Sequence, residues 1–320
     1  MGRPRRAWGA LLMVLVGCTA SALGTPAPAG ATAAVTPPCQ SVEALVAHAD
    51  GGVTVYDPYA GYCGGPVFDG SALGPHLNAP IVGIATTPDS GGYWLVASDG
   101  GVFAFGDAGF YGSTGSLRLN KPIVGIAATP DGKGYWLVAA DGGIFSFGDA
   151  TFHGSTGNVI LNQPIVGMAA DGATGGYWLA AADGGVFAFD APFLGSMGGT
   201  HLNAPIRFVT GTPDFGGYRM VASDGGVFDF GDAVYYGSAA APGSAGWDAL
   251  AVDVEGGNGY WLFATDDGTT CGISTTPCGP PPPYGYAVIE GFGAIPSLTG
   301  ASAGNITPSP IVAAASLSLR

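Results

Sequence analysis

A stretch of about 42 residues recurs several times along this chain, and the recurrence limits the architectures that the chain can form. The six residues 77–82 (LNAPIV) return with small changes at 119–124, 161–166 and 202–207, at spacings of 42, 42 and 41 residues. A fifth, more diverged copy begins near Trp247. Periods of this length are typical of proteins in which one supersecondary unit, unable to bury its own apolar surface, is covered by neighbouring copies of itself.

Each copy contains four apolar segments. In the first copy they are 80–88 (PIVGIATTP), 92–97 (GYWLVA), 101–107 (GVFAFGD) and 110–115 (FYGSTG). The segments are short, are rich in β-branched and aromatic residues, and are bounded by Gly and Pro, a pattern that predicts strands and not helices. Asp-Gly-Gly between the second and third segments predicts a hairpin. We therefore expect four strands in each copy.

The central segment of each copy is apolar at both alternating positions, as in 93–97 (YWLVA), so both faces of its sheet should be buried. Four short strands per copy, covered on both faces by similar units, are typical of a β-propeller blade. We predict an all-β protein of that class. A β-solenoid is the structural alternative, although its coils usually repeat at shorter periods. An outer-membrane barrel would need strands of roughly 9 to 11 residues with one lipid-facing parity.

The two ends of the repeat region predict how the ring closes. Residues 44–57 (ALVAHADGGVTVYD) match the middle of a copy but lack the first segment, and 310–318 (PIVAAASLS) supplies that segment from the other end of the chain. One blade shared between the two ends would cover the first and last strand edges, and the blade count becomes six. The fifth copy is interrupted by a Cys- and Pro-rich insert at 269–284, in which prolines 280–283 should form a polyproline II segment on the surface.

The first 33 residues have the features of an export signal: three arginines, an apolar stretch from Ala10 to about Leu23, and small residues near the end. Within this stretch, 15–18 (LVGC) also resembles a bacterial lipobox. Its Cys18 would be lipidated and would hold the protein on the outer face of the cytoplasmic membrane. Secretion and lipid anchoring both stay open. We assign 1–33 to the signal peptide, 34–41 to a short linker and 42–320 to the propeller.

Four cysteines follow the signal: Cys39, Cys63, Cys271 and Cys278. An even number favours two disulfides in an exported protein. We pair Cys39 with Cys63 and Cys271 with Cys278, although four cysteines allow three connectivities. A zinc site is not favoured, because no C-x-x-C occurs and the histidines show no ligand spacing.

The chain is acidic, with a formal net charge of −14. Without the three arginines of the signal, six Lys and Arg stand against 23 Asp and Glu, a formal charge of −17. Such a surface repels phosphate backbones, so we exclude nucleic acid as a partner. The 58 glycines follow no Gly-X-Y period and agree with many tight turns. We expect a monomer.

Residues 122–150 (PIVGIAATPDGKGYWLVAADGGIFSFGDA) resemble a tandem repeat of secreted bacterial proteins, which often stands beside cell-wall hydrolase, peptidase or amidase domains and sometimes stands alone. The similarity covers roughly 77–232 and extends more weakly towards both ends. The resemblance implies an extracellular, propeller-like accessory or binding module.

The fourth copy departs from the repeat at three charged positions. Arg207 replaces a valine, Arg219 replaces a tryptophan, and Asp229 replaces an alanine. With a three-residue turn between their strands, Arg219 and Asp229 should lie on the same face of adjacent strands and form an ion pair. The alternative interpretation is an anion-binding spot at Arg207 and Arg219.

One aspartate stands before the glycines of every predicted hairpin: Asp50, Asp99, Asp141, Asp183, Asp224 and Asp266. Asp is favoured before Gly in tight turns, which explains the column without a ligand. These hairpins should share a face with variable loops such as 113–118 and 158–160, so the six carboxylates could also bind polyhydroxylated ligands or calcium. No other cofactor is expected. The aromatic columns that begin with Tyr93, Trp94, Phe103 and Phe105 are interpreted as packing between blades rather than as sugar-stacking platforms.

Catalytic motifs are weak in this chain. Residues 300–304 (GASAG) fit G-x-S-x-G, but a hydrolase of that kind needs a later histidine, and the last histidine is His201. A sialidase-like propeller would need an arginine cluster and flanking carboxylates. We assign no catalytic residue and predict an exported, non-catalytic binding or scaffolding module at the cell surface or cell wall, with a glycan or protein ligand. A propeller-type hydrolase of carbohydrate or ester bonds stays the alternative.

Overall fold

The computed structural model describes residues 44–56, 69–73, 77–238, 250–253, 260–265, 286–290 and 311–316. The chain divides into two units, Met1–Pro38 and Cys39–Arg320, and all of the described residues belong to the second. Eighteen strands in these residues form six antiparallel sheets of three strands each. The described part of the chain contains no helix that could cross a membrane.

Four sheets come from consecutive copies of the repeat, and in each an inner strand pairs with a middle strand, which pairs with an outer strand. Their strands are β3 (Ile81–Thr86), β4 (Gly92–Ala97) and β5 (Val102–Gly106); β6 (Ile123–Ala128), β7 (Gly134–Ala139) and β8 (Ile144–Gly148); β9 (Ile165–Ala170), β10 (Tyr177–Ala181) and β11 (Val186–Phe189); and β12 (Ile206–Gly211), β13 (Gly217–Ala222) and β14 (Val227–Gly231). The fifth sheet contains β15 (Leu250–Asp253), β16 (Tyr260–Thr265) and β17 (Tyr286–Glu290). In the first four copies the first three predicted segments thus form strands, and the predicted Asp-Gly-Gly hairpin joins the second strand to the third.

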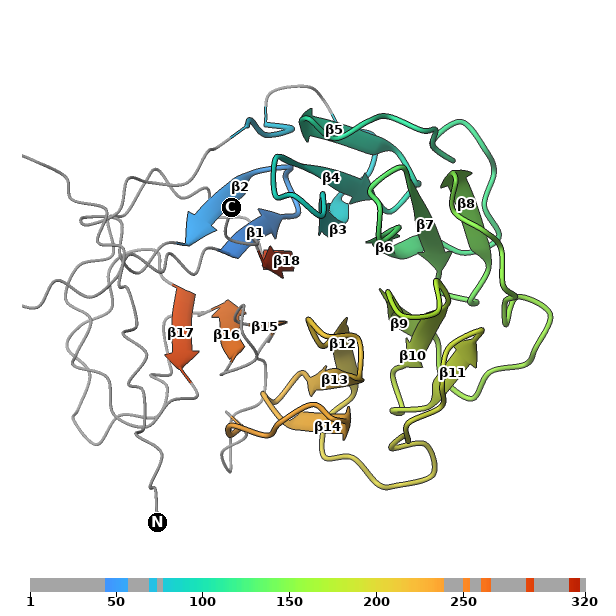
Figure 1. Cartoon of the computed structure of the whole chain (residues 1–320), viewed down its shortest axis with the longest axis vertical. Helices are drawn as coiled ribbons and strands as arrows, with labels where there is room; N and C mark the ends of the chain where they lie inside the picture. Colours follow the sequence, from blue (N-terminus) through green and yellow to red (C-terminus); the bar gives the residue numbers. More distant parts are fainter. Residues whose placement is uncertain are drawn as a thin grey trace, which may run out of the picture. The chain divides into compact units, whose positions relative to one another are not determined.

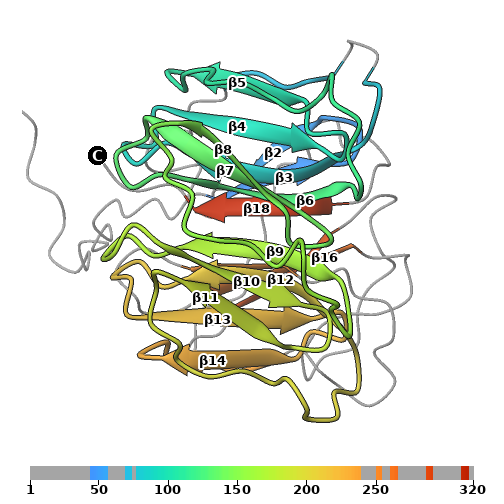
Figure 2. The same ribbon diagram turned by 90° about the vertical axis from the view of Figure 1, so that its right-hand side faces the viewer.

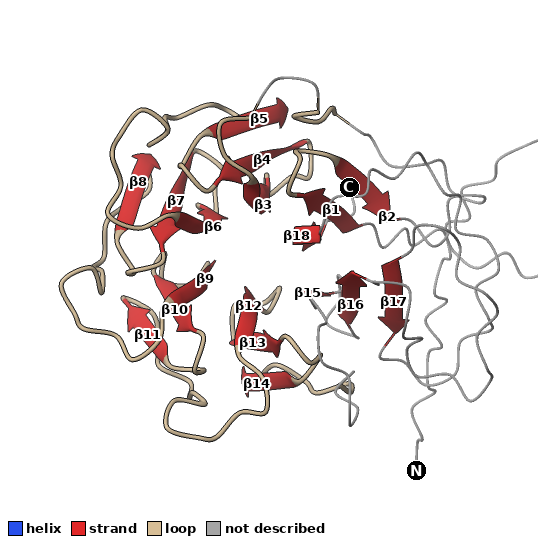
Figure 3. Ribbon diagram, turned by 180° about the vertical axis from the view of Figure 1, so that it is seen from behind, coloured by secondary structure: helices blue, strands red, loops and turns tan. Residues whose placement is uncertain are grey.

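The sixth sheet joins the two ends of the repeat region, as predicted. Its β18 (Ile311–Ser316) pairs with β1 (Ala44–His48), which pairs with β2 (Val53–Tyr56). The inner strands contact one another in the order β18, β3, β6, β9, β12 and β15, and β15 contacts β18 again. This closed circuit surrounds the centre of the ring in Figures 1 and 3. The protein is a six-bladed β-propeller, and the shared blade pairs β1, the first strand of the ring, along both of its edges.

The middle strands form the core, because both faces of each sheet are covered. All residues of β4, β7 and β10 are buried. In the register of these sheets a large residue faces a small one: Trp94 lies opposite Ala104, and Trp178 lies opposite Ala188. The aromatic columns of Tyr93 and Trp94 are 0 to 1% exposed, which confirms that they pack between blades.

The expectation of a fourth strand in each copy is wrong for the described copies. The segment after β5 forms no strand; its backbone is bonded by side chains from two sheets instead. The Nε1 of Trp94 donates to the carbonyl of Gly109 at 2.7 Å, and the hydroxyl of Tyr135, in the next blade, donates to the carbonyl of Gly112 at 2.5 Å. Gly112 has φ of 138°, and a Cβ there would lie 2.5 Å from the ring of Phe147. These hydrogen bonds occupy backbone carbonyls of the segment that would pair with a neighbouring strand if the segment were part of the sheet.

Several predicted features lie outside the described residues. They are the signal peptide and its Cys18, the linker, the cysteines Cys39, Cys63, Cys271 and Cys278, the insert at 269–284, the 300–304 motif and Asp266. Their assignments stay predictions.

Candidate functional site

Five of the six hairpin aspartates are described, and each forms a turn within its own hairpin. The Oδ1 of each accepts a hydrogen bond of 2.9 to 3.0 Å from the N–H two residues further on. The five are Asp50, Asp99, Asp141, Asp183 and Asp224. A carboxylate that accepts this bond stabilises the tight turn, so the turn explains why Asp recurs.

The same hairpins also join neighbouring blades. In the first copy, the carbonyl of Ser98 accepts from the N–H of Ile123, the first residue of the next inner strand, at 2.9 Å. The carbonyl of Gly100 accepts from the N–H of Thr114 at 3.0 Å. Equivalent hydrogen bonds, from the first N–H of an inner strand to a carbonyl in the hairpin of the preceding blade, are present at β3, β9 and β12. The Asp-Gly-Gly sequence is therefore part of the joint between blades.

These hairpins emerge on one face of the ring. In Figure 2, β4 and β13 run across the ring in the same direction, so the hairpins that follow them, at Asp99 and Asp224, lie on the same face. We call this the hairpin face. It also carries the loops between blades, in which Leu117, Val159 and Ile160 are 58%, 56% and 100% exposed.

Two hollows open on the hairpin face. One, of about 230 Å³, is lined by Ser98, Asp99, Leu117, Leu119, Asn120, Lys121 and Pro122. The other, of about 180 Å³, is lined by Asn203, Ala204, Ala222, Asp224, Gly226, Val227, Phe228 and Ser238. Each hollow contains one hairpin aspartate. In the part of the chain that is described, no group of three or more His, Cys, Asp or Glu is placed to hold a metal ion, and calcium binding stays a prediction.

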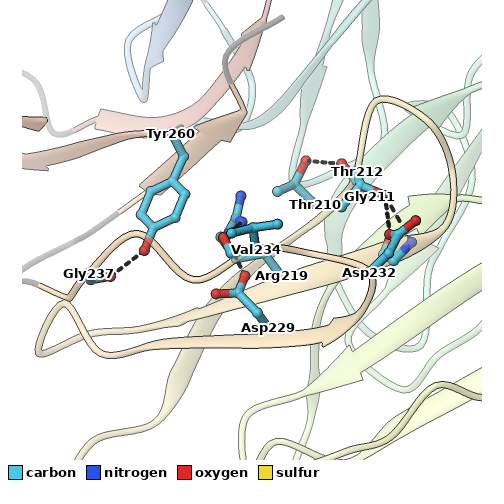
Figure 4. A network of polar contacts seen from close by, with 10 residues as sticks. Thr210, Gly211, Thr212, Arg219, Asp229, Asp232, Val234, Gly237 and Tyr260 are labelled. Carbon is cyan, nitrogen blue, oxygen red and sulfur yellow. Dashed lines mark hydrogen bonds and ion pairs between the residues drawn. The ribbon is translucent and has the colours of Figure 1, made fainter. Parts of the chain in front are cut away.

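Arg219, on β13, occupies the position that tryptophan holds in the three preceding blades, and it is 1% exposed. Its Nε donates to Asp229 Oδ1 at 2.5 Å, and its Nη2 donates to the carbonyl of Val234 at 2.9 Å (Figure 4). The guanidinium carbon lies 3.9 Å from the ring centre of Tyr260, in the next sheet. The predicted ion pair with Asp229 is confirmed. These contacts favour the structural interpretation of Arg219 over the anion-binding one.

The electrostatics around Arg219 are those of a buried pair. Burial raises the pKa of Asp229 above its ordinary value, and Arg219 offsets only part of that effect. Burial and the charge of Asp229 raise the pKa of Tyr260 to about 12. Among the described residues, Asp229 Oδ2 finds no hydrogen-bond partner, and the same is true of the hydroxyl of Ser146, which lies at the equivalent position of β8.

Arg207 is not brought together with Arg219. It lies on the inner strand β12, within the shift of register between Ile206 and Phe208, and its side chain is exposed. Arg219 lies on the middle strand and is buried. The two predicted anion-binding residues therefore do not form one site.

The sequence interpretation missed a third group of residues. Phe110, Phe152, Phe193 and Tyr235 are exposed aromatics at equivalent positions of four copies. The repeat itself contains the signal, since an aromatic residue recurs there at spacings of 42, 41 and 42 residues. Aromatic residues elsewhere in the repeat are core, however, and sequence alone does not distinguish a buried column from an exposed one.

No family model and no curated protein matches the chain. Among solved structures, the chain is similar to the β-propeller domain of Cps50 (Swd1) from Myceliophteria thermophila, with 10% sequence identity and a TM-score of 0.44. That similarity covers 72% of this chain and 80% of the other. The class of the protein, a six-bladed β-propeller, follows from its own strand order and from the contacts that close its ring.

Proposed function

We propose that the protein is an exported, non-catalytic binding or scaffolding module of the cell surface or cell wall, and that it binds a glycan or an extracellular protein through the hairpin face. The observation that carries this proposal is the contrast within that face. The hairpins are held by hydrogen bonds to other parts of the protein. The loops between them differ in sequence from copy to copy and expose Leu117, Val159 and Ile160. Exposed apolar side chains beside hollows with both polar and apolar lining residues are typical of binding surfaces.

The N-terminal sequence supports export. A basic start, an apolar stretch and small residues near position 33 are the features that signal peptidase recognises. The intact mass of the mature protein tests this part of the proposal, since cleavage near residue 33, lipidation at Cys18 and each disulfide change the mass in different ways.

Binding is tested on an isolated cell-wall fraction, treated with protease or left untreated, with retention and released products measured in parallel. We expect retention without product release. Retention that survives protease identifies a glycan, and retention that protease abolishes identifies a protein. Release of products that one carboxylate substitution abolishes would contradict a non-catalytic role.

The hairpin face is tested by replacing Leu117, Val159 and Ile160 together with Ser. We expect retention to fall at least about tenfold, because apolar contacts at a binding surface are lost, while the thermal midpoint stays unchanged. Phe215→Ser is the matched control: Phe215 is 41% exposed but lies in the turn between β12 and β13, at the opposite end of these strands. Asp99→Asn keeps an acceptor for the turn and removes the charge, so it reports separately on the carboxylate.

A further inference from the structure

Four exposed aromatic side chains lie at the periphery of the ring, one in each of four blades. Phe110, Phe152, Phe193 and Tyr235 are 62%, 58%, 62% and 58% exposed. Each lies in the segment that follows an outer strand, and these segments run along the outside of the ring after β5, β8 and β11 (Figure 1). The Tyr93 and Trp94 columns are buried, and the Phe103 and Phe105 columns are half-buried between blades. The fold therefore packs all four of those aromatic columns between blades and leaves the column that begins with Phe110 exposed to solvent.

The backbone beneath these rings is held on both sides. Before Phe110, the carbonyl of Gly109 accepts from Trp94 Nε1 at 2.7 Å. After it, the N–H of Tyr111 donates to the hydroxyl of Tyr135, in the next blade, at 3.3 Å. The exposed ring thus stands between two bonds that come from two different sheets.

The same arrangement recurs in the next copy. The carbonyl before Phe152 accepts from Trp136 Nε1 at 2.7 Å, and the N–H after it donates to the hydroxyl of Tyr177 at 3.1 Å. Before Phe193, Trp178 supplies the bond at 2.7 Å. A backbone that is already fixed loses little conformational entropy when its side chain binds a ligand.

The fourth position keeps this support although the tryptophan is replaced. The Nη2 of Arg219 donates to the carbonyl of Val234, directly before Tyr235, at 2.9 Å. The exposed residue there is also aromatic, and its hydroxyl adds a donor and an acceptor. Both the support and the exposed ring are thus present in four successive copies.

The surroundings of the rings favour a sugar over other ligands. An exposed aspartate stands three residues before each ring: Asp107, Asp149, Asp190 and Asp232. A flat aromatic face covers the C–H face of a pyranose, and a carboxylate accepts hydrogen bonds from sugar hydroxyls. The strongly acidic chain disfavours polyanions. The rings come one per blade, whereas a protein partner would favour one contiguous apolar patch.

We propose that the periphery of the ring is a second binding surface, for a neutral polysaccharide whose sugar rings stack on Phe110, Phe152, Phe193 and Tyr235. A polymer suits the arrangement because one chain with repeated sugars can engage several equivalent rings, which raises its overall affinity. The inference rests on the binding role proposed above, but it does not depend on the hairpin face.

The test is native electrophoresis of the full protein through gels that contain hydroxyethyl cellulose, glucomannan or arabinogalactan. We expect at least one of these polymers to retard the protein. The variant Phe110→Ala/Phe152→Ala/Phe193→Ala/Tyr235→Ala should bind at least about 100-fold more weakly, the lower end of an avidity effect, and each single substitution should cost much less. Phe215→Ala, which removes an exposed aromatic outside the set, should bind as the unchanged protein does.

Three outcomes would contradict the proposal of a second binding surface: no retardation by any of the three polymers, unchanged retardation of the quadruple variant, or a loss of retardation with Phe215→Ala that equals the loss with the quadruple variant. The four single variants provide the same comparison if the quadruple variant unfolds. Cell-wall retention that falls with the Leu117, Val159 and Ile160 substitutions, together with gel retardation that is absent or unchanged in the quadruple variant, would contradict the peripheral surface and leave the proposed function supported. Absence of retention by both the cell-wall fraction and the polymers would overturn both.

Discussion

The blades that carry a tryptophan in the middle strand and the blade that carries Arg219 satisfy the same structural requirement with different side chains. In the first type, Trp94 Nε1 donates to the carbonyl of Gly109 at 2.7 Å. In the second, Arg219 Nη2 donates to the equivalent carbonyl, that of Val234, at 2.9 Å. The position therefore requires a long side chain that fills the space between blades and also donates to the segment after the outer strand.

The replacement has an electrostatic consequence. A tryptophan faces Ala104 or Ala188 across the sheet, whereas Arg219 faces Asp229. Both members of the pair are almost fully buried, with side chains 2% and 6% exposed. A tryptophan needs no counter-ion, but a buried arginine does. The replacement of the tryptophan by Arg219 therefore requires the replacement of the alanine by Asp229.

Removing one partner of that pair should have the largest effect. Arg219→Met leaves Asp229 buried without its counter-ion, and we expect a loss of about 3–5 kcal/mol in the free energy of unfolding. Urea denaturation at neutral pH measures it. The double variant Arg219→Met/Asp229→Ala leaves no unpaired charge and should lose less, so a loss equal to that of Arg219→Met would contradict the electrostatic explanation.

The hairpin joint is common to both blade types, and glycine substitutions measure how tightly it is packed. Gly142 has φ of +76°, and a Cβ there would lie 1.7 Å from Thr156 Oγ1. Gly142→Ala should therefore cost about 2–4 kcal/mol, from left-handed strain and overpacking together. Gly175→Ala is the matched control, since Gly175 has φ of +78° but nothing within 4 Å of its Cβ position. It should cost about 1 kcal/mol, and equal losses at the two sites would show that the joint is loose.

The interblade tyrosines predict a dependence on alkaline pH. Burial raises the pKa of Tyr135, Tyr177 and Tyr218, and raises that of Tyr260 to about 12. Since these phenols ionise more easily in the unfolded chain, stability should be complete below about pH 10 and should fall as the pH rises towards the folded values. Urea midpoints across this range measure the fall.

Tyr135→Phe sharpens that prediction. It removes the hydroxyl that donates to the carbonyl of Gly112 and accepts from the N–H groups of Tyr111 and Gly112, and it should cost at least about 1 kcal/mol at neutral pH. The variant should also lose less stability than the unchanged protein above about pH 10, because one raised pKa is gone. An identical alkaline slope in the two proteins would exclude Tyr135 as a source of the effect.

The period, the Asp-Gly-Gly hairpins and the split first blade were sufficient to predict the ring, because each depends on local turn chemistry and on strands that bury both faces. The fourth strand was predicted wrongly, because bonds from Trp94 and Tyr135 to the following segment depend on tertiary positions that no local pattern encodes. The pairing of Arg219 with Asp229 followed from register, yet its bond to Val234 did not. For the same reason, the exposure of Phe110 was not predictable.

The smallest effect is expected when the Arg219 blade is converted to the other type. Arg219→Trp/Asp229→Ala restores the residue pair found at β10 and β11, and the indole should donate to the carbonyl of Val234 as Trp178 donates to that of Pro192. Replacing a buried ion pair by well-packed apolar residues is often neutral or stabilising, so the free energy of unfolding should fall by no more than about 1 kcal/mol, or should rise. Arg219→Trp alone should be less stable than the double variant, because Asp229 stays buried without its partner. Calorimetry of both variants measures the difference, and a double variant as unstable as Arg219→Met would mean that this blade needs the charged pair itself and not only its volume and its donor.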